Sequence, residues 1–223
     1  MPVPTLAALK SDKNKTAELC LAEVHRYGYA LRYVPEDMKT KEVCLAAVQK
    51  TGAALVFVPE ELKSAEMCLV AVQQDGDALR YVPASMKTNE LYLASVQKTG
   101  GALEYVPEEI KSKEICLAAV QQNGRALKYI PAEIKSAEIC FEAVQQNGWA
   151  LEYVPDNLKT TEMCLAAIRA HYTRSWDRND CTFEYVPDNL KTEEMCLTAV
   201  CRDGRALEHV PENLRNCKKI TCN

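Results

Sequence analysis

The chain repeats one pattern of apolar and polar residues with a period of 24 residues. In residues 111–131, KSKEICLAAVQQNGRALKYIP, apolar side chains recur at Ile115, Cys116, Ala119 and Val120. This spacing places them on one face of a helix. The segment ALKYI after the glycine fits a second, short helix, which must end at the following proline because the residue before a proline avoids helical backbone angles. Each unit therefore predicts a long helix, a corner, a short helix and a proline turn.

The pattern occurs eight times and covers nearly the whole chain. The units open at Thr16, Thr40, Ser64, Thr88, Ser112, Ser136, Thr160 and Thr192. A fixed period in this range is typical of stacked arrays, in which each repeat contacts mainly its neighbours. We therefore expect a single repeat domain over residues 1–223. It comprises an N-terminal cap (1–15), repeats at 16–39, 40–63, 64–87, 88–111, 112–135, 136–159, 160–191 and 192–215, and a C-terminal tail (216–223).

Both ends of each long helix carry recognisable signals. The opening Ser or Thr is an N-cap, and a Glu two residues later lies where the helix dipole favours negative charge. Seven of the eight glycines stand at the corner after the long helix. We expect these glycines to adopt the left-handed conformation that is common just past a helix C-terminus.

These signals predict an all-α fold, an α-solenoid of eight 24-residue helix-turn-helix repeats. The alternative is an α/β solenoid like that of leucine-rich repeats, which have a similar rhythm of leucine and proline. The paired alanines and the Glu and Gln residues of the long segment favour helix over strand.

Composition and charge narrow the classes of partner. The 223 residues are 48% hydrophobic and 26% charged, and the formal net charge is −4. An acidic chain lacks the basic surplus that nucleic acids and anionic membranes attract, so we expect neither as a partner. The first residues contain no basic segment followed by an apolar stretch. We therefore expect a cytoplasmic protein and leave export by a signal-less route open.

Seven of the eleven cysteines occupy one repeat position, four residues after the opening Ser or Thr. Stacked helices lie about 8–10 Å apart, whereas a disulfide requires Cα atoms within about 7 Å. We therefore expect a column of buried thiols, as suits a reducing compartment. Four cysteines stand outside the column, at Cys181, Cys201, Cys217 and Cys222. They are either surface thiols or, together with His171, a small metal or redox site. Their spacing matches no zinc pattern, so we expect no metal and no cofactor.

The wording of the repeats resembles a known family. Residues 116–131, CLAAVQQNGRALKYIP, are similar to units that read LAAVQQNGxALxYxxxELKxDxE in an uncharacterised family of helical repeats, found mainly in bacterial proteins. The resemblance extends from about Thr16 to Arg215 and implies a helical repeat fold without a particular activity. The chain departs from the family in having Ser or Thr where Asp is expected before the long helix, and Cys where an aliphatic residue is common.

Two polar rows are expected along the long helices. One is a glutamine that recurs at Gln49, Gln73, Gln97, Gln121 and Gln145. Regularly spaced amides could bind an extended peptide, and the alternative is a solvated face in which glutamine is simply a good helix former. The other is the lysine before each N-cap, which we expect near the early Glu residues in surface ion pairs of little energetic weight.

Residues that vary between repeats are candidates for binding, because the fixed residues are committed to folding. The variation concentrates at the corner and at one exposed position of the short helix, where the candidates are Tyr27, Tyr29, Arg125 and Trp149. We expect Trp149 to be exposed and to be the strongest candidate, since tryptophan is enriched in binding hot spots. Neutral variation of a surface is the alternative for each of them.

The seventh repeat replaces its glycine corner with an insertion of eight residues. The expected loop, residues 170–179, contains Tyr172, Arg174, Trp176 and Arg178. Insertions at one corner of a solenoid map to one face, which is often the binding face. The loop is therefore a second candidate for binding, and a tolerated insertion is the alternative.

Familiar catalytic motifs do not occur in the sequence, among them the glycine-rich phosphate loop, HExxH, CxxC and the serine nucleophile elbow. We therefore expect a non-enzymatic scaffold that binds a protein or peptide through the solenoid surface and the loop at 170–179. The alternative is a metal- or thiol-dependent protein that uses the cysteine-rich C-terminal end. An open end of the solenoid could also support a dimer.

Overall fold

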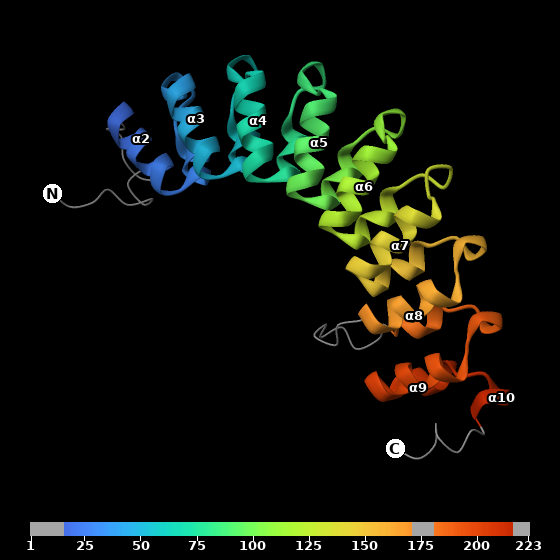
Figure 1. The fold of residues 1–223 in the computed structure, drawn as a ribbon. Helices are drawn as coiled ribbons and strands as arrows, with labels where there is room; N and C mark the ends of the chain where they lie inside the picture. The colour runs from blue at the N-terminus through green and yellow to red at the C-terminus, as the bar shows by residue number, and fades with distance from the viewer. Residues whose placement is uncertain (1–15, 171–180, 216–223) are drawn as a thin grey trace. The chain divides into compact units, whose positions relative to one another are not determined.

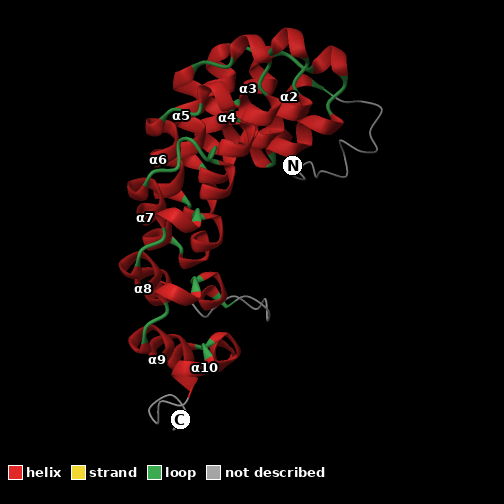
Figure 2. Ribbon diagram, turned by 90° about the vertical axis from the view of Figure 1, so that its right-hand side faces the viewer, coloured by secondary structure: helices red, strands yellow, loops and turns green. Residues whose placement is uncertain are grey.

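The computed structural model describes residues 16–170 and 181–215, and the only regular secondary structure in these ranges is helical (Figure 2). The all-α prediction is therefore confirmed, and no strand in the described ranges supports the leucine-rich-repeat alternative. The chain divides into two compact units, Met1–Ile110 and Lys111–Asn223. Within each unit, four repeats follow one another side by side (Figure 1).

Each repeat begins with an α-helix of ten residues. In the first unit these helices are α2 (Ala17–Arg26), α3 (Lys41–Lys50), α4 (Ala65–Gln74) and α5 (Asn89–Lys98). In the second unit they are α6 (Lys113–Gln122), α7 (Ala137–Gln146), α8 (Thr161–Ala170) and α9 (Glu193–Arg202), and α10 (Glu212–Arg215) closes the last repeat. Neighbouring long helices within a unit pack against each other.

The predicted short helix is a 3₁₀ helix. These helices are η1 (Gly28–Tyr33), η3 (Gly52–Phe57), η5 (Gly76–Tyr81), η7 (Gly100–Tyr105), η9 (Gly124–Tyr129), η10 (Gly148–Tyr153), η12 (Thr182–Tyr185) and η14 (Gly204–His209). Three-residue 3₁₀ turns follow most of the prolines, at η2 (Glu36–Met38), η4 (Glu60–Leu62), η6 (Ala84–Met86), η8 (Glu108–Ile110), η11 (Asp156–Leu158) and η13 (Asp188–Leu190). The residue before the proline is extended, with φ −74° and ψ 129° at Val34, as predicted for a position where the helix must end.

The predicted N-caps are confirmed in all eight described long helices. In each, the side-chain oxygen of the opening Ser or Thr accepts a hydrogen bond of 3.1–3.3 Å from the backbone N–H three residues later. A cap of this kind stabilises a helix by about 1 kcal/mol.

The predicted core positions are buried. On α6, the side chains of Ile115, Cys116, Ala119 and Val120 are at most 5% exposed. The short helices add a fully buried leucine in six repeats, at Leu31, Leu55, Leu79, Leu103, Leu127 and Leu151. Burying one leucine side chain stabilises the fold by about 1.5–3 kcal/mol, so the short helices are a large part of the core.

The corner glycines do not adopt the predicted left-handed conformation. No described glycine has a positive φ, and each corner glycine is instead the first residue of a 3₁₀ helix. Other residues can adopt this backbone conformation, so backbone freedom does not explain why glycine recurs.

Close packing between neighbouring repeats explains these glycines. A Cβ added to Gly28 would lie 2.5 Å from the carbonyl oxygen of Ala47 and 2.6 Å from Cβ of Thr51, both in the following repeat. The equivalent carbonyl oxygen also lies too close for a Cβ at Gly52, Gly76 and Gly124. By contrast, a Cβ on Gly204 in the last repeat would meet no atom within 4 Å. Glycine is therefore needed where another long helix packs against the corner.

The lysine before the N-cap has a largely buried side chain in at least four described repeats, contrary to the expected surface pairing with the early Glu residues. The side chains of Lys39, Lys63, Lys159 and Lys191 are only 5–8% exposed. Each of these four lysines pairs with the acidic residue three positions earlier, at Glu36, Glu60, Asp156 and Asp188.

Five of the lysines that precede an N-cap also donate a hydrogen bond to the carbonyl oxygen of the last residue of the next short helix. Nζ of Lys111 donates a hydrogen bond of 2.7 Å to the carbonyl oxygen of Tyr129. The same bond, at 2.8–2.9 Å, is made by Lys63, Lys135, Lys159 and Lys191. Carbonyls at the end of a helix lack partners within the helix, and a buried ammonium group needs acceptors. The lysine satisfies both requirements and links successive repeats.

The packing of the corner glycines predicts that alanine substitution is costly only inside the stack. Gly124→Ala should lower the free energy of unfolding by about 1–3 kcal/mol, because the added methyl group overpacks against the carbonyl oxygen of Ala143. Gly204→Ala is the matched control, with the same repeat position and open space around the new Cβ. Urea unfolding followed by circular dichroism measures both, and equal stability of the two variants would contradict this account.

Candidate interaction surface

The corner and the exposed side of the short helix form a candidate surface in each unit, here called the corner surface. In the fifth repeat it contains Asn123, Arg125 and Lys128, whereas Ala126 and Leu127 between them are buried. The short helices of neighbouring repeats pack on one another within each unit. Equivalent corner residues therefore form continuous rows.

A local hydrogen bond fixes the corner in four repeats. The side-chain oxygen of the corner residue accepts a bond of 3.0–3.1 Å from the N–H two residues later, at Asp75, Asn123, Asn147 and Asp203. This is an Asx turn. Tyr27 occupies the same position in the first repeat, makes no such bond, and is 49% exposed. The corner of the first repeat therefore presents an aromatic ring in place of a residue with a folding role.

Some of the predicted binding residues lie together. The guanidinium carbon of Arg125 is 5.8 Å from the ring centroid of Trp149, which is a cation–π contact. Trp149 is half-buried rather than exposed as predicted, and this contact is one reason. In the first unit, the ring of Tyr29 meets that of Phe57 edge-on at 6.3 Å between centroids. Each of the two contacts joins neighbouring repeats.

The sequence reasoning did not identify an aromatic row on this surface. The last residue of the short helix is half-buried in every described repeat, at Tyr33, Phe57, Tyr81, Tyr105, Tyr129, Tyr153, Tyr185 and His209. The guanidinium of Arg80 lies 4.7 Å from the ring centroid of Tyr81, and Nζ of Lys128 lies 4.4 Å from that of Tyr129. Aromatic residues at one fixed repeat position were the signal that could have found this row.

The long helices carry the polar rows. All five predicted glutamines, Gln49, Gln73, Gln97, Gln121 and Gln145, are exposed. Two of the early Glu residues pair with a basic residue of the preceding long helix, Lys113 with Glu138 at 2.6 Å and Arg169 with Glu194 at 3.0 Å. All four side chains are more than half exposed, so each pair contributes less than about 1 kcal/mol.

The predicted loop residues Tyr172, Arg174, Trp176 and Arg178 lie outside the described residues, as do His171, Cys217 and Cys222. The repeat that contains the loop nevertheless keeps its register. Lys159 binds the carbonyl oxygen of Tyr185 at 2.8 Å across 26 residues, a bond that the other repeats make across 18.

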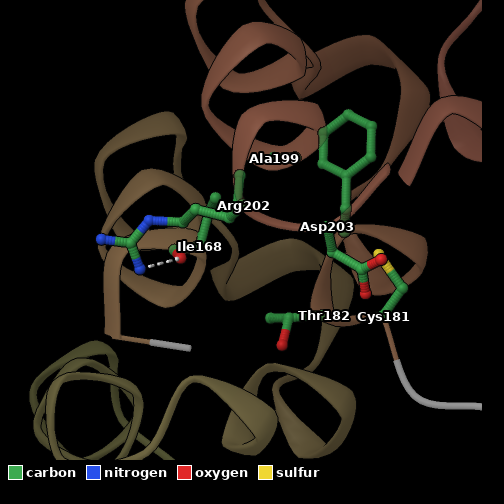
Figure 3. Close-up of a pocket in the computed structure, with 7 residues that line it drawn as sticks. Ile168, Cys181, Thr182, Ala199, Arg202 and Asp203 are labelled. Carbon is green, nitrogen blue, oxygen red and sulfur yellow. Dashed lines mark hydrogen bonds between the residues drawn. The ribbon is translucent and has the colours of Figure 1, made fainter. Parts of the chain in front are cut away.

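A small cavity lies between the seventh and eighth repeats (Figure 3). Its lining consists of Ile168, Cys181, Thr182, Phe183, Ala199, Arg202 and Asp203. The cavity volume is ≈ 10 Å³, about the space that one water molecule needs. Arg202 donates hydrogen bonds to the carbonyl oxygens of Ile168 at 3.2 Å and Arg169 at 2.6 Å, near the C-terminal end of α8. We interpret the cavity as a packing feature of the altered corner.

The cysteine column is buried as predicted. Its members Cys20, Cys44, Cys68, Cys116, Cys140, Cys164 and Cys196 are 0% exposed. None of the described cysteines is in a disulfide. Burial raises the pKa of three of these thiols, Cys44, Cys116 and Cys164, to about 11, although a nearby lysine acts in the opposite direction. The thiols are therefore protonated at neutral pH and are poor nucleophiles.

The two described cysteines outside the column differ from each other. Cys201 is exposed, as expected of a surface thiol. Cys181 is buried, contrary to the prediction, because it lines the cavity between two repeats, and burial raises its thiol pKa. Within residues 16–170 and 181–215, no group of three or more His, Cys, Asp and Glu side chains could hold a metal ion.

Among the described residues, nothing covers a face of the last repeat that the other repeats bury. Leu207 is 41% exposed, whereas the equivalent leucines are fully buried. An open groove of ≈ 500 Å³ is lined by Gly204, Leu207, Glu208 and Arg215. This groove is here called the end face.

Stacked pairs of helices with a fixed period place the chain in the class of α-solenoid repeat proteins. The chain belongs to the family described as a domain of unknown function, DUF4116, whose model matches residues 40–87, 89–135, 137–191 and 162–215. This confirms the expected membership of an uncharacterised repeat family. Searches of curated proteins and of solved structures found no match. None of the described helices is long and apolar enough to cross a membrane.

The burial of the thiols predicts which cysteines react in the folded protein. In a Cys217→Ser, Cys222→Ser background, iodoacetamide should label Cys201 within minutes, while the column and Cys181 react only after unfolding. Peptide mass spectrometry measures the labelling at each site, and a sample in urea gives the full count. Labelling of Cys116 as fast as that of Cys201 would contradict the buried column.

Proposed function

We propose that this protein is a non-enzymatic scaffold that binds a protein or peptide through its corner surface. The observation that carries the proposal is that each repeat contains two groups of residues, one required for folding and one that varies on the surface. Caps, corner glycines, buried lysines and core residues recur because the stack requires them. Apart from the residue that closes the Asx turn, the exposed residues of the corner surface have no shared folding role, and they hold different aromatic and charged side chains in successive repeats.

The rows formed by these residues suit an extended partner. Short helices pack on one another within each unit, so corner residues of neighbouring repeats contact one another, as Arg125 and Trp149 do. Aromatic and arginine side chains contribute most to binding hot spots. The buried, protonated thiols are compatible with a reducing compartment such as the cytoplasm.

A binding comparison tests the scaffold function. Immobilised wild-type protein should retain a partner from cell lysate, and the purified partner should bind the wild-type chain in isothermal titration calorimetry. If the partner uses the second unit, Trp149→Ala should weaken binding by about tenfold or more, as loss of a hot-spot side chain does. A variant in which residues 170–179 are replaced by a glycine corner tests the loop. A wild-type protein that binds nothing with measurable affinity would argue against the scaffold.

We also propose that the end face pairs with the end face of a second copy. Leu207, Glu208 and Arg215 line this face together. A two-fold axis near Leu207 would bury two leucines and could bring each Glu208 near the other copy's Arg215. Such a face is self-complementary, as a two-fold interface requires.

The dimer proposal predicts a change in mass on substitution. Leu207→Glu should abolish self-association because it places two carboxylates at the centre of the interface. Sedimentation equilibrium of the full chain measures the mass, with Lys128→Glu as the control at an exposed residue of another repeat. A wild-type protein that stays monomeric at concentrations of about 100 μM would contradict the dimer proposal, because stable interfaces have dissociation constants below this concentration.

A further inference from the structure

We propose that the corner surface of the first two repeats binds an acidic peptide segment that carries apolar side chains. The proposed site consists of Tyr27, Tyr29, Arg32 and Val56, with the ring of Phe57 against Tyr29, and is here called the aromatic-basic patch. The inference rests on the scaffold function proposed above and names the ligand class of one part of the surface.

Exposed apolar side chains gather in this patch. Four large hydrophobic residues in the described ranges are exposed, and Tyr27, Tyr29 and Val56 are three of them, at 49%, 54% and 42%. Leu207 is the fourth and belongs to the end face. The edge-on contact of Tyr29 with Phe57 joins the first repeat to the second, and Tyr27 and Val56 stand within two residues of these rings along the chain. The four residues therefore belong to one region of the surface. Contiguous exposed apolar residues of this kind mark interaction sites.

Two of these residues depart from what the other repeats have at the same position. Tyr27 replaces a corner residue that in four other repeats closes an Asx turn. Val56 is the fifth residue of its short helix, and every other repeat has a charged residue there. Those residues are Arg32, Arg80, Glu104, Lys128, Glu152, Glu184 and Glu208. Neither departure has a folding role in the structure.

The charge of the patch indicates the sign of the ligand. Residues 24–35 and 48–59 contain no Asp or Glu, although the chain has a net charge of −4. The exposed cations in these segments include Arg26, Arg32 and Lys50, and the guanidinium of Arg26 lies 5.2 Å from the ring centroid of Tyr27. A basic rim around apolar anchors favours an acidic segment and disfavours basic competitors.

Selection from a random peptide library tests the ligand class. Phage-displayed 12-residue peptides are selected on the immobilised full chain, and the best peptide is resynthesised and measured by fluorescence anisotropy. Selected peptides should be enriched in Asp and Glu together with large apolar residues. The affinity should fall by about tenfold or more in Tyr29→Ser and in Arg32→Glu, and it should weaken as salt concentration rises.

A matched variant separates the patch from general electrostatics. Lys128→Glu makes the same charge change at the same repeat position in the second unit, and it should alter the affinity less than about twofold. All three substituted side chains belong to exposed residues, where substitutions are usually tolerated. Unchanged thermal unfolding of the variants confirms that they are folded.

The outcomes distinguish this inference from the scaffold function. Peptides that bind Arg32→Glu and Tyr29→Ser as tightly as wild type would place the binding site elsewhere and overturn the patch, while the scaffold would stand. Selection of basic peptides would also overturn the patch. Failure of the wild-type chain to retain any peptide would count against both proposals. Self-association lost in Tyr29→Ser would identify a second copy as the occupant and overturn the acidic ligand.

Discussion

The approach of the corner glycines inside the stack, such as Gly28, Gly52, Gly76 and Gly124, to a carbonyl oxygen of the next long helix is the contact on which the stack depends. Because Gly28 lacks a Cβ, the corner can lie against the backbone at Ala47. This closeness brings the lysine before the N-cap within reach of the next short helix. It also explains why Ser95, which stands where six other repeats have alanine, can donate a hydrogen bond of 2.8 Å to the carbonyl oxygen of Gly76.

Sequence reasoning predicted the features that depend on local periodicity. The helices, their N-caps and the cysteine column follow from residue type and spacing within one repeat. The role of the glycines could not be predicted in this way, because it depends on Ala47 lying against Gly28, and the sequence signal for that contact is the same as for a left-handed helix end. The burial of Lys63 was missed because its acceptor, the carbonyl of Tyr81, is a backbone group that no residue type reveals.

The candidate surface was predicted only in part, because it too depends on contacts between repeats. Variation between repeats pointed to Tyr29 and Trp149, but the exposure of each depends on the neighbouring repeat. Trp149 is half-buried and lies against Arg125, whereas Tyr29 stays largely exposed beside Phe57. Contacts between adjacent corners therefore decide which of the variable residues remain available to a partner.

The same architecture allows one chain to carry surfaces of different character. In a stacked array each repeat contacts mainly its neighbours, so a corner can change without altering the distant core. Such a substitution destabilises the fold only by removing the local Asx turn or cation–π contact. The first two repeats use this freedom to expose aromatic and basic side chains, while the last three have Glu152, Glu184 and Glu208 at the equivalent short-helix position. The sign of the exposed charge can therefore differ from repeat to repeat through residues on which the stack does not depend.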